Sequence, residues 1–257
     1  MKKILTIVLS VLIFLAAAFI GVANVYRVDG VVLDAKTVSE EAKIEAKQMQ
    51  MELEEAYRGE SSLFAKNEAA LAVIEKYPYF RLTKFEKRYP DVLYVEATED
   101  TEVFAVEADG EYYILSENGT VLDIREEKLN RADGQPNVIV KGAVPQGGIG
   151  DTVSGDGLSE LLQMCSLMAK SLNGVRSNVE EVRFDDVGNG GRIFLCMRER
   201  VQITVYNPQL LTEEKAAAFT EKYLALDDEE RLTGFIHVTE SLDKTQVIIS
   251  YRPNTLD

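Results

Sequence analysis

The chain has 257 residues, enough for one large domain or two small ones, and a formal net charge of −15 at pH 7. Such acidity excludes a nucleic-acid interface, which needs clustered Lys and Arg to displace the counterions of phosphates. One histidine, His237, and two cysteines, Cys165 and Cys196, exclude paired-histidine or cysteine-rich metal sites and a disulfide-dense scaffold.

An uncharged, mostly apolar run, Ile4–Ala23, lies near the start of the chain. As a helix it would be about 30 Å long, the thickness of the hydrocarbon core of a bilayer. Two lysines precede the run and acidic residues dominate after it, so the positive-inside rule leaves residues 1–3 in the cytosol. The run predicts an uncleaved signal anchor. A signal peptide, cleaved after Ala18 or Ala23, is the alternative.

Residues 24–100 have the pattern of a small domain with the order strand, helix, helix, strand, strand. The first helix is predicted at Thr37–Tyr57, because Thr37-Val-Ser-Glu40 matches a capping box and Gly59 follows. Its apolar residues recur every three or four positions, which predicts one buried stripe. The stripe consists of Ala42, Ala46, Met49, Leu53 and Ala56.

The rest of this first domain is predicted to contain a second helix and three strands. Asn67 is the expected N-cap of a helix that continues to Tyr77, with Leu71 and Ile74 facing inward. The domain is expected to end near Thr98–Thr101, where the strand pattern changes to a charged stretch with little to bury. The strands are predicted at Val28–Leu33, Phe80–Arg88 and Val92–Thr98.

Residues 101–252 are predicted to form a larger domain that consists mostly of strands. Asn118-Gly119 is predicted to be a two-residue hairpin turn with positive φ at both positions. Helices are predicted at Leu158–Leu172 and from Thr212, and Gly142–Gly157 is predicted to be a flexible surface loop. The strands are predicted at Tyr112–Ser116, Thr120–Arg125, Asn137–Lys141, Val179–Asp186, Arg192–Arg198, Val201–Tyr206, Phe235–Thr239 and Thr245–Tyr251.

No catalytic, cofactor-binding or metal-binding residue is predicted from the sequence. The glycine-rich loop matches neither a dinucleotide fingerprint nor a P-loop. His237 lies in a strand pattern without a nucleophile motif, which favours a structural role. Cys165 and Cys196 are predicted to be buried thiols, and a disulfide between them is the alternative if the helix packs on that strand.

Several stretches resemble, in their order along the chain, the pattern of one family of bacterial cell-division proteins. Gly59-Glu-Ser-Ser-Leu-Phe64 resembles a glycine-x-asparagine-leucine-phenylalanine segment, and Lys87–Glu96 resembles the passage R-x-x-P-x-T-L-x-I. Tyr112–Val121 resembles a D-x-x-G-x-V hairpin, and Pro136–Gly142 resembles P-x-I-x-G. With the apolar N-terminal run, these stretches make the chain similar to the FtsQ family, called DivIB in Gram-positive bacteria.

The resemblance implies a fold of class α+β. A single N-terminal transmembrane helix would precede a small POTRA-like domain and a larger mixed, mostly antiparallel sheet domain with two helices. The bulk of this single-pass membrane protein would lie outside the cytosol, at the division septum. The segments would be a cytosolic tip at 1–3, the anchor at 4–23, the POTRA-like domain at 24–100, the β domain at 101–252 and a tail at 253–257.

The resemblance also implies a non-catalytic scaffold of the divisome that acts in septum formation through protein–protein binding. It would hold membrane proteins of the FtsL and FtsB/DivIC type and link them to peptidoglycan synthases, without a cofactor. The alternatives are an exported or membrane-anchored enzyme or ligand-binding protein, and another POTRA-bearing export or sporulation protein. A deep pocket with perturbed carboxylates would favour the enzyme.

The last predicted strand is the predicted partner-binding site. Alternate side chains along this strand are mostly apolar and are expected to face the core, whereas the side chains between them are mostly polar. This alternation is typical of a strand in a sheet with one exposed face. Pro253 then stops the ladder, which fits an edge strand. The resemblance favours docking by addition of a partner strand, and an edge that is merely protected is the alternative. The predicted site residues are Thr245, Gln246, Val247, Ile248, Ile249, Ser250 and Tyr251.

Overall fold

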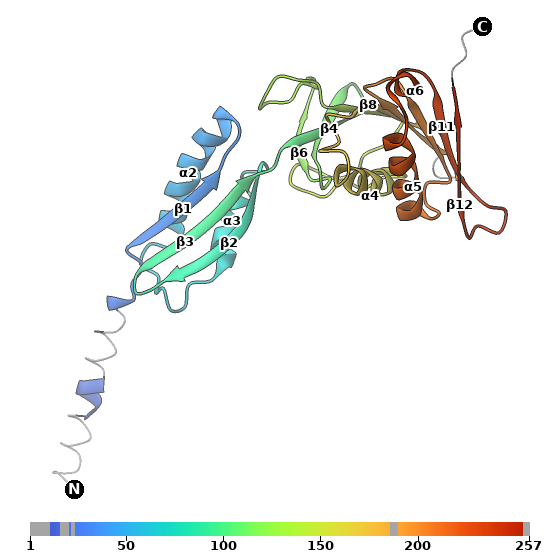
Figure 1. Cartoon of the computed structure of the whole chain (residues 1–257). Coiled ribbons are helices and arrows are strands. Elements are labelled where there is room, and N and C mark those ends of the chain that lie inside the picture. Colours follow the sequence, from blue (N-terminus) through green and yellow to red (C-terminus); the bar gives the residue numbers. More distant parts are fainter. Residues whose placement is uncertain (1–10, 16–20, 22–23, 186–189, 254–257) are drawn as a thin grey trace. The chain divides into compact units, whose positions relative to one another are not determined.

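The computed structural model describes residues 11–15, 21, 24–185 and 190–253 (Figure 1). The chain divides into two compact units, Met1–Asp100 and Thr101–Asp257. The division falls inside the charged stretch Glu99–Glu102. Each unit has its own sheet, so each builds its own core.

The predicted fold class and the predicted single-pass membrane localisation are both corrected by the structure. Within the described ranges no helix is long and apolar enough to cross a membrane, and nine strands form one sheet. Apart from residues 11–15 and Gly21, the predicted anchor lies outside the described residues, as does a cleavage site after Ala18 or Ala23.

Over residues 24–100 the structure describes a three-stranded sheet with the helices α2 and α3. The central strand β3 pairs in parallel with β1 and antiparallel with β2. Helix α2 packs against α3 and β1, and α3 packs against β2, so both helices cover the same sheet. The elements are β1 (Gly30–Lys36), α2 (Glu40–Ala56), α3 (Asn67–Ile74), β2 (Phe80–Arg88) and β3 (Val92–Glu99).

A buried carboxylate determines where α2 begins. The Glu99 side chain on β3 is buried and accepts hydrogen bonds from the Ser39 hydroxyl at 2.6 Å and from the Ser39 and Val38 amides at 2.9 and 2.5 Å. The Ser39 hydroxyl oxygen accepts from the Ala42 amide, so Ser39 is the N-cap. The prediction that Thr37 caps this helix is therefore wrong. The local sequence could not distinguish Ser39 from Thr37, because Glu99, the residue that binds Ser39, is remote in the sequence.

The other helix ends and faces also differ in places from their predictions. Helix α3 ends at Ile74 rather than Tyr77, and its N-cap is Lys66 rather than Asn67. Ile74 is buried as predicted, whereas Leu71 is exposed and Val73 takes the inward position. In the stripe of α2, Ala42, Met49 and Leu53 are buried, whereas Ala46 and Ala56 are only partly buried.

The second unit is one nine-stranded sheet in the order β12-β11-β10-β9-β8-β7-β4-β5-β6. The pairs β10–β11, β4–β7 and β7–β8 are parallel, and the remaining pairs are antiparallel. Its strands are β4 (Glu102–Ala108), β5 (Glu111–Ser116), β6 (Val121–Arg125), β7 (Val138–Lys141), β8 (Val179–Asp185), β9 (Arg192–Met197), β10 (Gln202–Tyr206), β11 (Phe235–Glu240) and β12 (Val247–Arg252).

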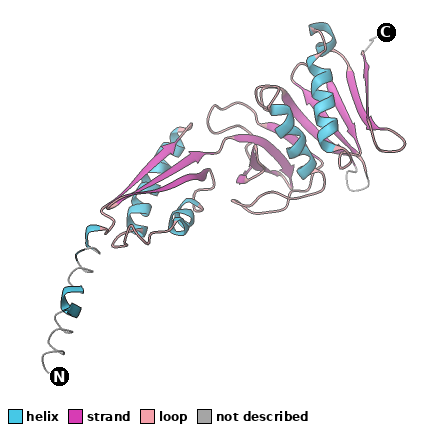
Figure 2. Ribbon diagram, turned by 60° about the horizontal axis from the view of Figure 1, so that its bottom comes forward, coloured by secondary structure: helices cyan, strands magenta, loops and turns pink. Residues whose placement is uncertain are grey.

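Helices α4 (Leu158–Ala169) and α5 (Thr212–Leu224) lie side by side on this sheet (Figure 2). They bury an apolar core with the inward side chains of the strands, among them Leu195, Ile203 and Ile236. A third, short helix α6 (Asp228–Leu232) follows α5, whereas two helices were predicted for this domain. Leu211, with positive φ, rather than Thr212 is the N-cap of α5.

A different hairpin turn from the predicted one takes positive φ at two consecutive residues. Asp109 and Gly110 join β4 to β5 with φ of 52° and 89°. In the predicted turn only Gly119 takes positive φ, at 81°, while Asn118 does not. The predicted hairpin does join β5 to β6, and only the conformation of Asn118 differs from the prediction. Asp-Gly has the same conformational preference as Asn-Gly, so the signal for the turn at Asp109-Gly110 was also present in the sequence.

The charged stretch between the two units is buried on both sides of the division, contrary to the sequence expectation. Glu99 belongs to the first unit, and the Glu102 carboxylate in the second accepts hydrogen bonds from the Arg125 guanidinium at 2.8 Å and the Asn137 amide at 3.0 Å. Burial raises the pKa of Asp100, partly offset by the charge of Arg81. The Glu99 and Glu102 carboxylates are hydrogen-bonded within their own units, which makes their burial tolerable.

We expect the fragment Thr101–Asp257 to fold alone. The Glu102 carboxylate accepts hydrogen bonds from Arg125, Arg131 and Asn137, which lie in the second unit, so removing residues 1–100 leaves these contacts of the buried carboxylate in place. The measurement is the dispersion of amide signals in a two-dimensional NMR spectrum. A collapsed, undispersed spectrum would mean that the two units form one cooperative structure.

A buried ion pair joins α5 to the end of β11. The Lys215 ammonium is fully buried and donates three hydrogen bonds, to the carbonyls of Tyr206 and Asn207 and, at 2.8 Å, to the Glu240 carboxylate. Burial by itself would raise the pKa of Glu240. Hydrogen bonds from Lys215 and Asn207, with the charge of Lys215, outweigh burial and hold this pKa below its usual value.

Glu240→Gln should therefore destabilise the protein and also change its pH dependence. A lowered folded-state pKa contributes stability that is present above the unfolded-state pKa of about 4.3 and is lost as the pH falls through the folded value. At neutral pH the loss should be about 3 kcal/mol, because the buried ammonium loses its anion. Urea unfolding from about pH 3 to 7 should show a shallower acid decline for the variant than for the wild type. Parallel curves would contradict this role of Glu240.

Candidate functional site

The outermost strands of the nine-stranded sheet, β6 and β12, differ in what covers them. The segment Gly142–Gly157 folds along β6, where the amide of Val121 donates to the carbonyl of Asp151 at 2.9 Å. The amide of Gly150 donates to the carbonyl of Val121 at 2.8 Å. The segment is thus an edge cover for β6, not the free surface loop predicted from its glycines. In the part of the chain that the structure describes, no strand pairs with the outer side of β12.

The outward-facing backbone groups of β12 follow from the hydrogen-bond pattern. The Gln202 amide on β10 donates to the carbonyl of Gly234, so Gly234 and every second residue after it face β10. The backbone groups of the residues between them therefore face β12. These residues and their partners on β12 are Phe235 with Arg252, His237 with Ser250, and Thr239 with Ile248. The backbone groups that point to the open edge therefore belong to Val247, Ile249 and Tyr251.

The side chains of β12 alternate as the sequence predicted. Val247, Ile249 and Tyr251 pack against the core, whereas the side chains between them are exposed. Two predicted site residues, Thr245 and Gln246, lie outside the strand. They belong to the turn that precedes β12, where the Gln246 amide donates to the Ser241 hydroxyl oxygen. The structure thus places five of the seven predicted site residues on one strand.

A groove of about 560 Å³ runs between the edge strand β12 and helix α5. Ile249 and Tyr251 line it from the strand, and Ala218 and Ala225 line it from the helix. Small side chains on α5 leave the space that larger ones would fill. Glu221 and Lys222 supply charges of both signs at the groove, and the Lys222 ammonium lies 5.5 Å from the centre of the Tyr251 ring.

Tyr251 is held in place at the end of this groove. Its hydroxyl donates to the carbonyls of Thr233 at 2.9 Å and Glu230 at 3.2 Å. Burial and the neighbouring carboxylates of Glu230 and Asp227 raise the pKa of the phenol, which keeps the hydroxyl protonated as a donor. A Cβ at Gly234 would lie 2.6 Å from the ring, so only glycine permits this close packing.

The other residues considered in the sequence are not brought together into a reactive site. His237 lies 6.3 and 6.4 Å from the rings of Tyr206 and Phe235, measured between ring centres. Cys165 and Cys196 are free thiols, and burial raises the pKa of Cys165 to about 12. Within the described ranges, no group of three or more His, Cys, Asp or Glu side chains is placed to hold a metal ion.

Sequence reasoning found the strand but missed the α5 side of the groove. The available signal was the pair Ala218 and Ala225, two small residues on the helix predicted from Thr212. Comparison of the chain with models of known protein families and with curated proteins finds no match.

We expect the effect of proline on folding to alternate along β12. The Ser250 amide faces His237 on β11, so Ser250→Pro should cost about 1–3 kcal/mol more than Ser250→Ala by leaving the His237 carbonyl without its donor in the ladder. The Ile249 amide faces the open edge, so Ile249→Pro should have nearly the same melting temperature as Ile249→Ala. The alanine variant is the control, because it loses the isoleucine side chain but keeps the amide. Thermal melting of the four variants measures both differences. Equal penalties at the two positions would refute the assigned strand orientation.

Proposed function

We propose that this protein is a non-catalytic scaffold that binds an extended segment of a partner protein along β12. The observation that carries the proposal is the open outer edge of this strand beside the groove against α5. The backbone groups of Val247, Ile249 and Tyr251 offer the hydrogen bonds of an additional strand. Strand addition of this kind draws affinity from the main chain and specificity from pockets for alternate side chains.

The groove supports a partner strand with apolar residues on one face. A strand added beside β12 would direct every second side chain toward α5, where Ala218 and Ala225 leave room beside Ile249. Glu221 and Lys222 then favour polar or charged residues at the ends of that strand. The chemistry is that of a short amphipathic strand from another protein.

The resemblance to the FtsQ family suggests which partners to test. We infer a role in the cell-division complex, in which the chain holds proteins of the FtsL and FtsB/DivIC type and connects them to peptidoglycan synthases. Support comes from the order of the resembling stretches, from Gly59–Phe64 through Pro136–Gly142, together with the edge that β12 offers.

Ile249→Pro should weaken partner binding while the protein stays folded. Val247, Ile249 and Tyr251 direct their backbone groups outward, and the substitution removes the amide proton of the central one. A partner strand then loses a hydrogen bond and clashes with the proline ring. Binding to purified proteins of the FtsL and FtsB/DivIC type should weaken by about tenfold or more relative to Ile249→Ala. Unchanged affinity for a folded Ile249→Pro protein would show that β12 is not the docking strand.

The cellular test separates a division role from other binding roles. Depleting the protein should give filamentous cells without septa, and the wild type and Ile249→Ala should restore division. Ile249→Pro should fail to restore division at equal protein abundance. Normal septation after depletion would contradict the cell-division role and leave the strand-addition surface to another kind of partner.

A further inference from the structure

Three chain segments meet at the end of the first unit where β1 and β3 begin and β2 ends (Figure 1). The buried Ser62 joins them, because its amide donates to the carbonyl of Tyr26 at 2.7 Å and its hydroxyl donates to the carbonyl of Pro90. The amide of Asp29 also donates to the carbonyl of Asp91 at 2.9 Å. Residues 25–29, 58–64 and 87–91 are called the tip below. These hydrogen bonds make the tip one surface rather than three separate loops.

Large apolar side chains are exposed on the tip. Phe64 is 75% exposed, Tyr89 is 59% exposed and Leu63 is 37% exposed. Leu63 and Phe64 lie between two buried residues, Ser62 and Ala65, so the backbone holds both of these side chains outward. A cluster of exposed apolar side chains on a folded unit indicates an interaction surface.

The aromatic rings of the tip lie among charges of both signs. The rings of Tyr26 and Tyr89 contact each other edge to face, with 6.0 Å between their centres. The Lys87 ammonium donates to the carbonyl of Leu63 at 2.9 Å, which places a cation beside the exposed apolar residues. The charged residues of the tip are the cations Arg27, Arg58, Lys87 and Arg88 and the anions Asp29, Glu60 and Asp91. The tip therefore does not share the strong negative charge of the whole chain, which is −15.

This combination of side chains is typical of protein surfaces that contact the interface of a lipid bilayer. Tyrosine is enriched at the level of the headgroups, because its ring is apolar and its hydroxyl is polar. Lysine and arginine keep their charges in water while their aliphatic stems lie along apolar surface. A zwitterionic headgroup carries both a phosphate and an ammonium group, so it complements a surface that has charges of both signs.

The position of the tip in the chain favours a bilayer over a protein partner. Asn24, the residue before the tip, directly follows the uncharged run Ile4–Ala23. An apolar run of this length favours lipid over water. The tip is the part of the first unit that is joined to the run most directly, so the run brings the tip to lipid. Contact with the surface of a bilayer requires no helix that crosses it.

We propose that the tip docks on the surface of a lipid bilayer. The side chains of Phe64, Leu63 and Tyr89 insert among the headgroups, where their apolar surface leaves water. The cations of Arg58 and Lys87 lie at the level of the lipid phosphates. This contact is separate from partner binding along β12 and does not depend on it.

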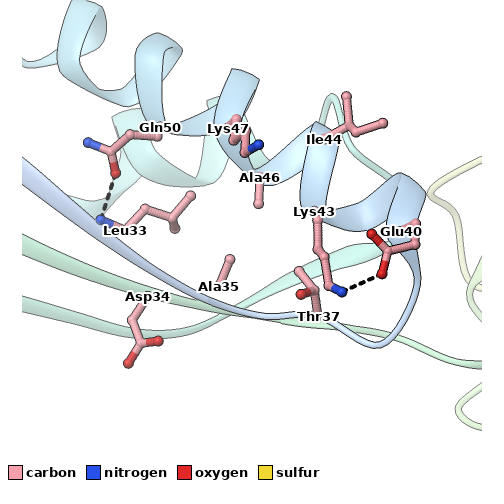
Figure 3. A pocket seen from close by; sticks show the side chains of 10 residues that line it. All are labelled: Leu33, Asp34, Ala35, Thr37, Glu40, Lys43, Ile44, Ala46, Lys47 and Gln50. Carbon is pink, nitrogen blue, oxygen red and sulfur yellow. Dashed lines mark hydrogen bonds and ion pairs between the residues drawn. The ribbon is translucent and has the colours of Figure 1, made fainter.

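The other end of the first unit carries a different kind of surface. A groove of about 690 Å³ lies there between β1 and α2, and Ala35 and Ala46 point toward each other across it (Figure 3). The Gln50 side chain covers part of the β1 edge, because its nitrogen donates to the carbonyl of Val31 at 2.6 Å and its oxygen accepts from the amide of Leu33 at 2.8 Å. The residues that line this groove include no aromatic ring. The groove therefore lacks the side chains that are typical of a bilayer contact.

Single tryptophans test the contact, because the chain contains no tryptophan of its own. Phe64→Trp labels the tip, and Ile44→Trp at the groove is the control, since Ile44 is also a largely exposed apolar residue, at 69%. Each full-length variant is reconstituted with phosphatidylcholine vesicles that contain lipids brominated close to the headgroups. The fluorescence of Phe64→Trp should shift to shorter wavelength and be quenched, whereas Ile44→Trp should show neither change. Attachment to the vesicles through the apolar run alone would not produce this difference.

Two double variants in the Phe64→Trp protein separate insertion of the tip from other contact with lipid. Leu63→Ser/Tyr89→Ser removes apolar surface from the tip and should lower the quenching by about half or more. Val38→Ser/Ile44→Ser removes exposed apolar side chains at the other end and should leave the quenching unchanged. All these proteins should melt like the wild type, because the substituted side chains are exposed. Equal quenching of Phe64→Trp and Ile44→Trp, no quenching of a folded Phe64→Trp protein, or quenching insensitive to Leu63→Ser/Tyr89→Ser would overturn the proposal.

Discussion

The outermost strands of an open sheet carry backbone groups that pair with no neighbouring strand, and this constraint shapes both units of the protein. The glycine-containing segment 142–157 covers β6 with main-chain hydrogen bonds. The Gln50 side chain covers two groups of β1. Beside β12 the described residues place a groove and no further strand. The degree of cover thus differs among these three edges.

The two grooves share a physical cause. In each unit a helix packs beside an edge strand and carries alanines where it faces that edge, Ala46 on α2 and Ala218 and Ala225 on α5. These small side chains leave a gap between the helix and the edge strand. A partner strand could therefore place its side chains in the gap and form main-chain hydrogen bonds with the edge strand. Both requirements of strand addition are met by the same local arrangement.

Buried charges connect elements that are far apart in the sequence. The Glu99 carboxylate on β3 accepts a hydrogen bond from the Ser39 amide at the start of α2. The Glu102 carboxylate accepts hydrogen bonds from Arg125 and Asn137, and the Lys215 ammonium on α5 donates to the Glu240 carboxylate on β11. Each is costly to bury alone and becomes acceptable only through these partners. Such contacts therefore determine helix starts and strand ends that local propensity leaves open.

The sequence by itself determined the type and approximate position of most elements, because hydrophobic periodicity is a local property. It placed β2 at Phe80–Arg88 without error and predicted the alternation along β12. The apolar run Ile4–Ala23 led to a membrane span that the described helices do not contain. Only the tertiary structure decided that Ser39 caps α2, that Gln50 covers β1 and that α5 borders β12. Each of these depends on which remote segments pair, and periodicity within one element carries no information about its neighbours in space.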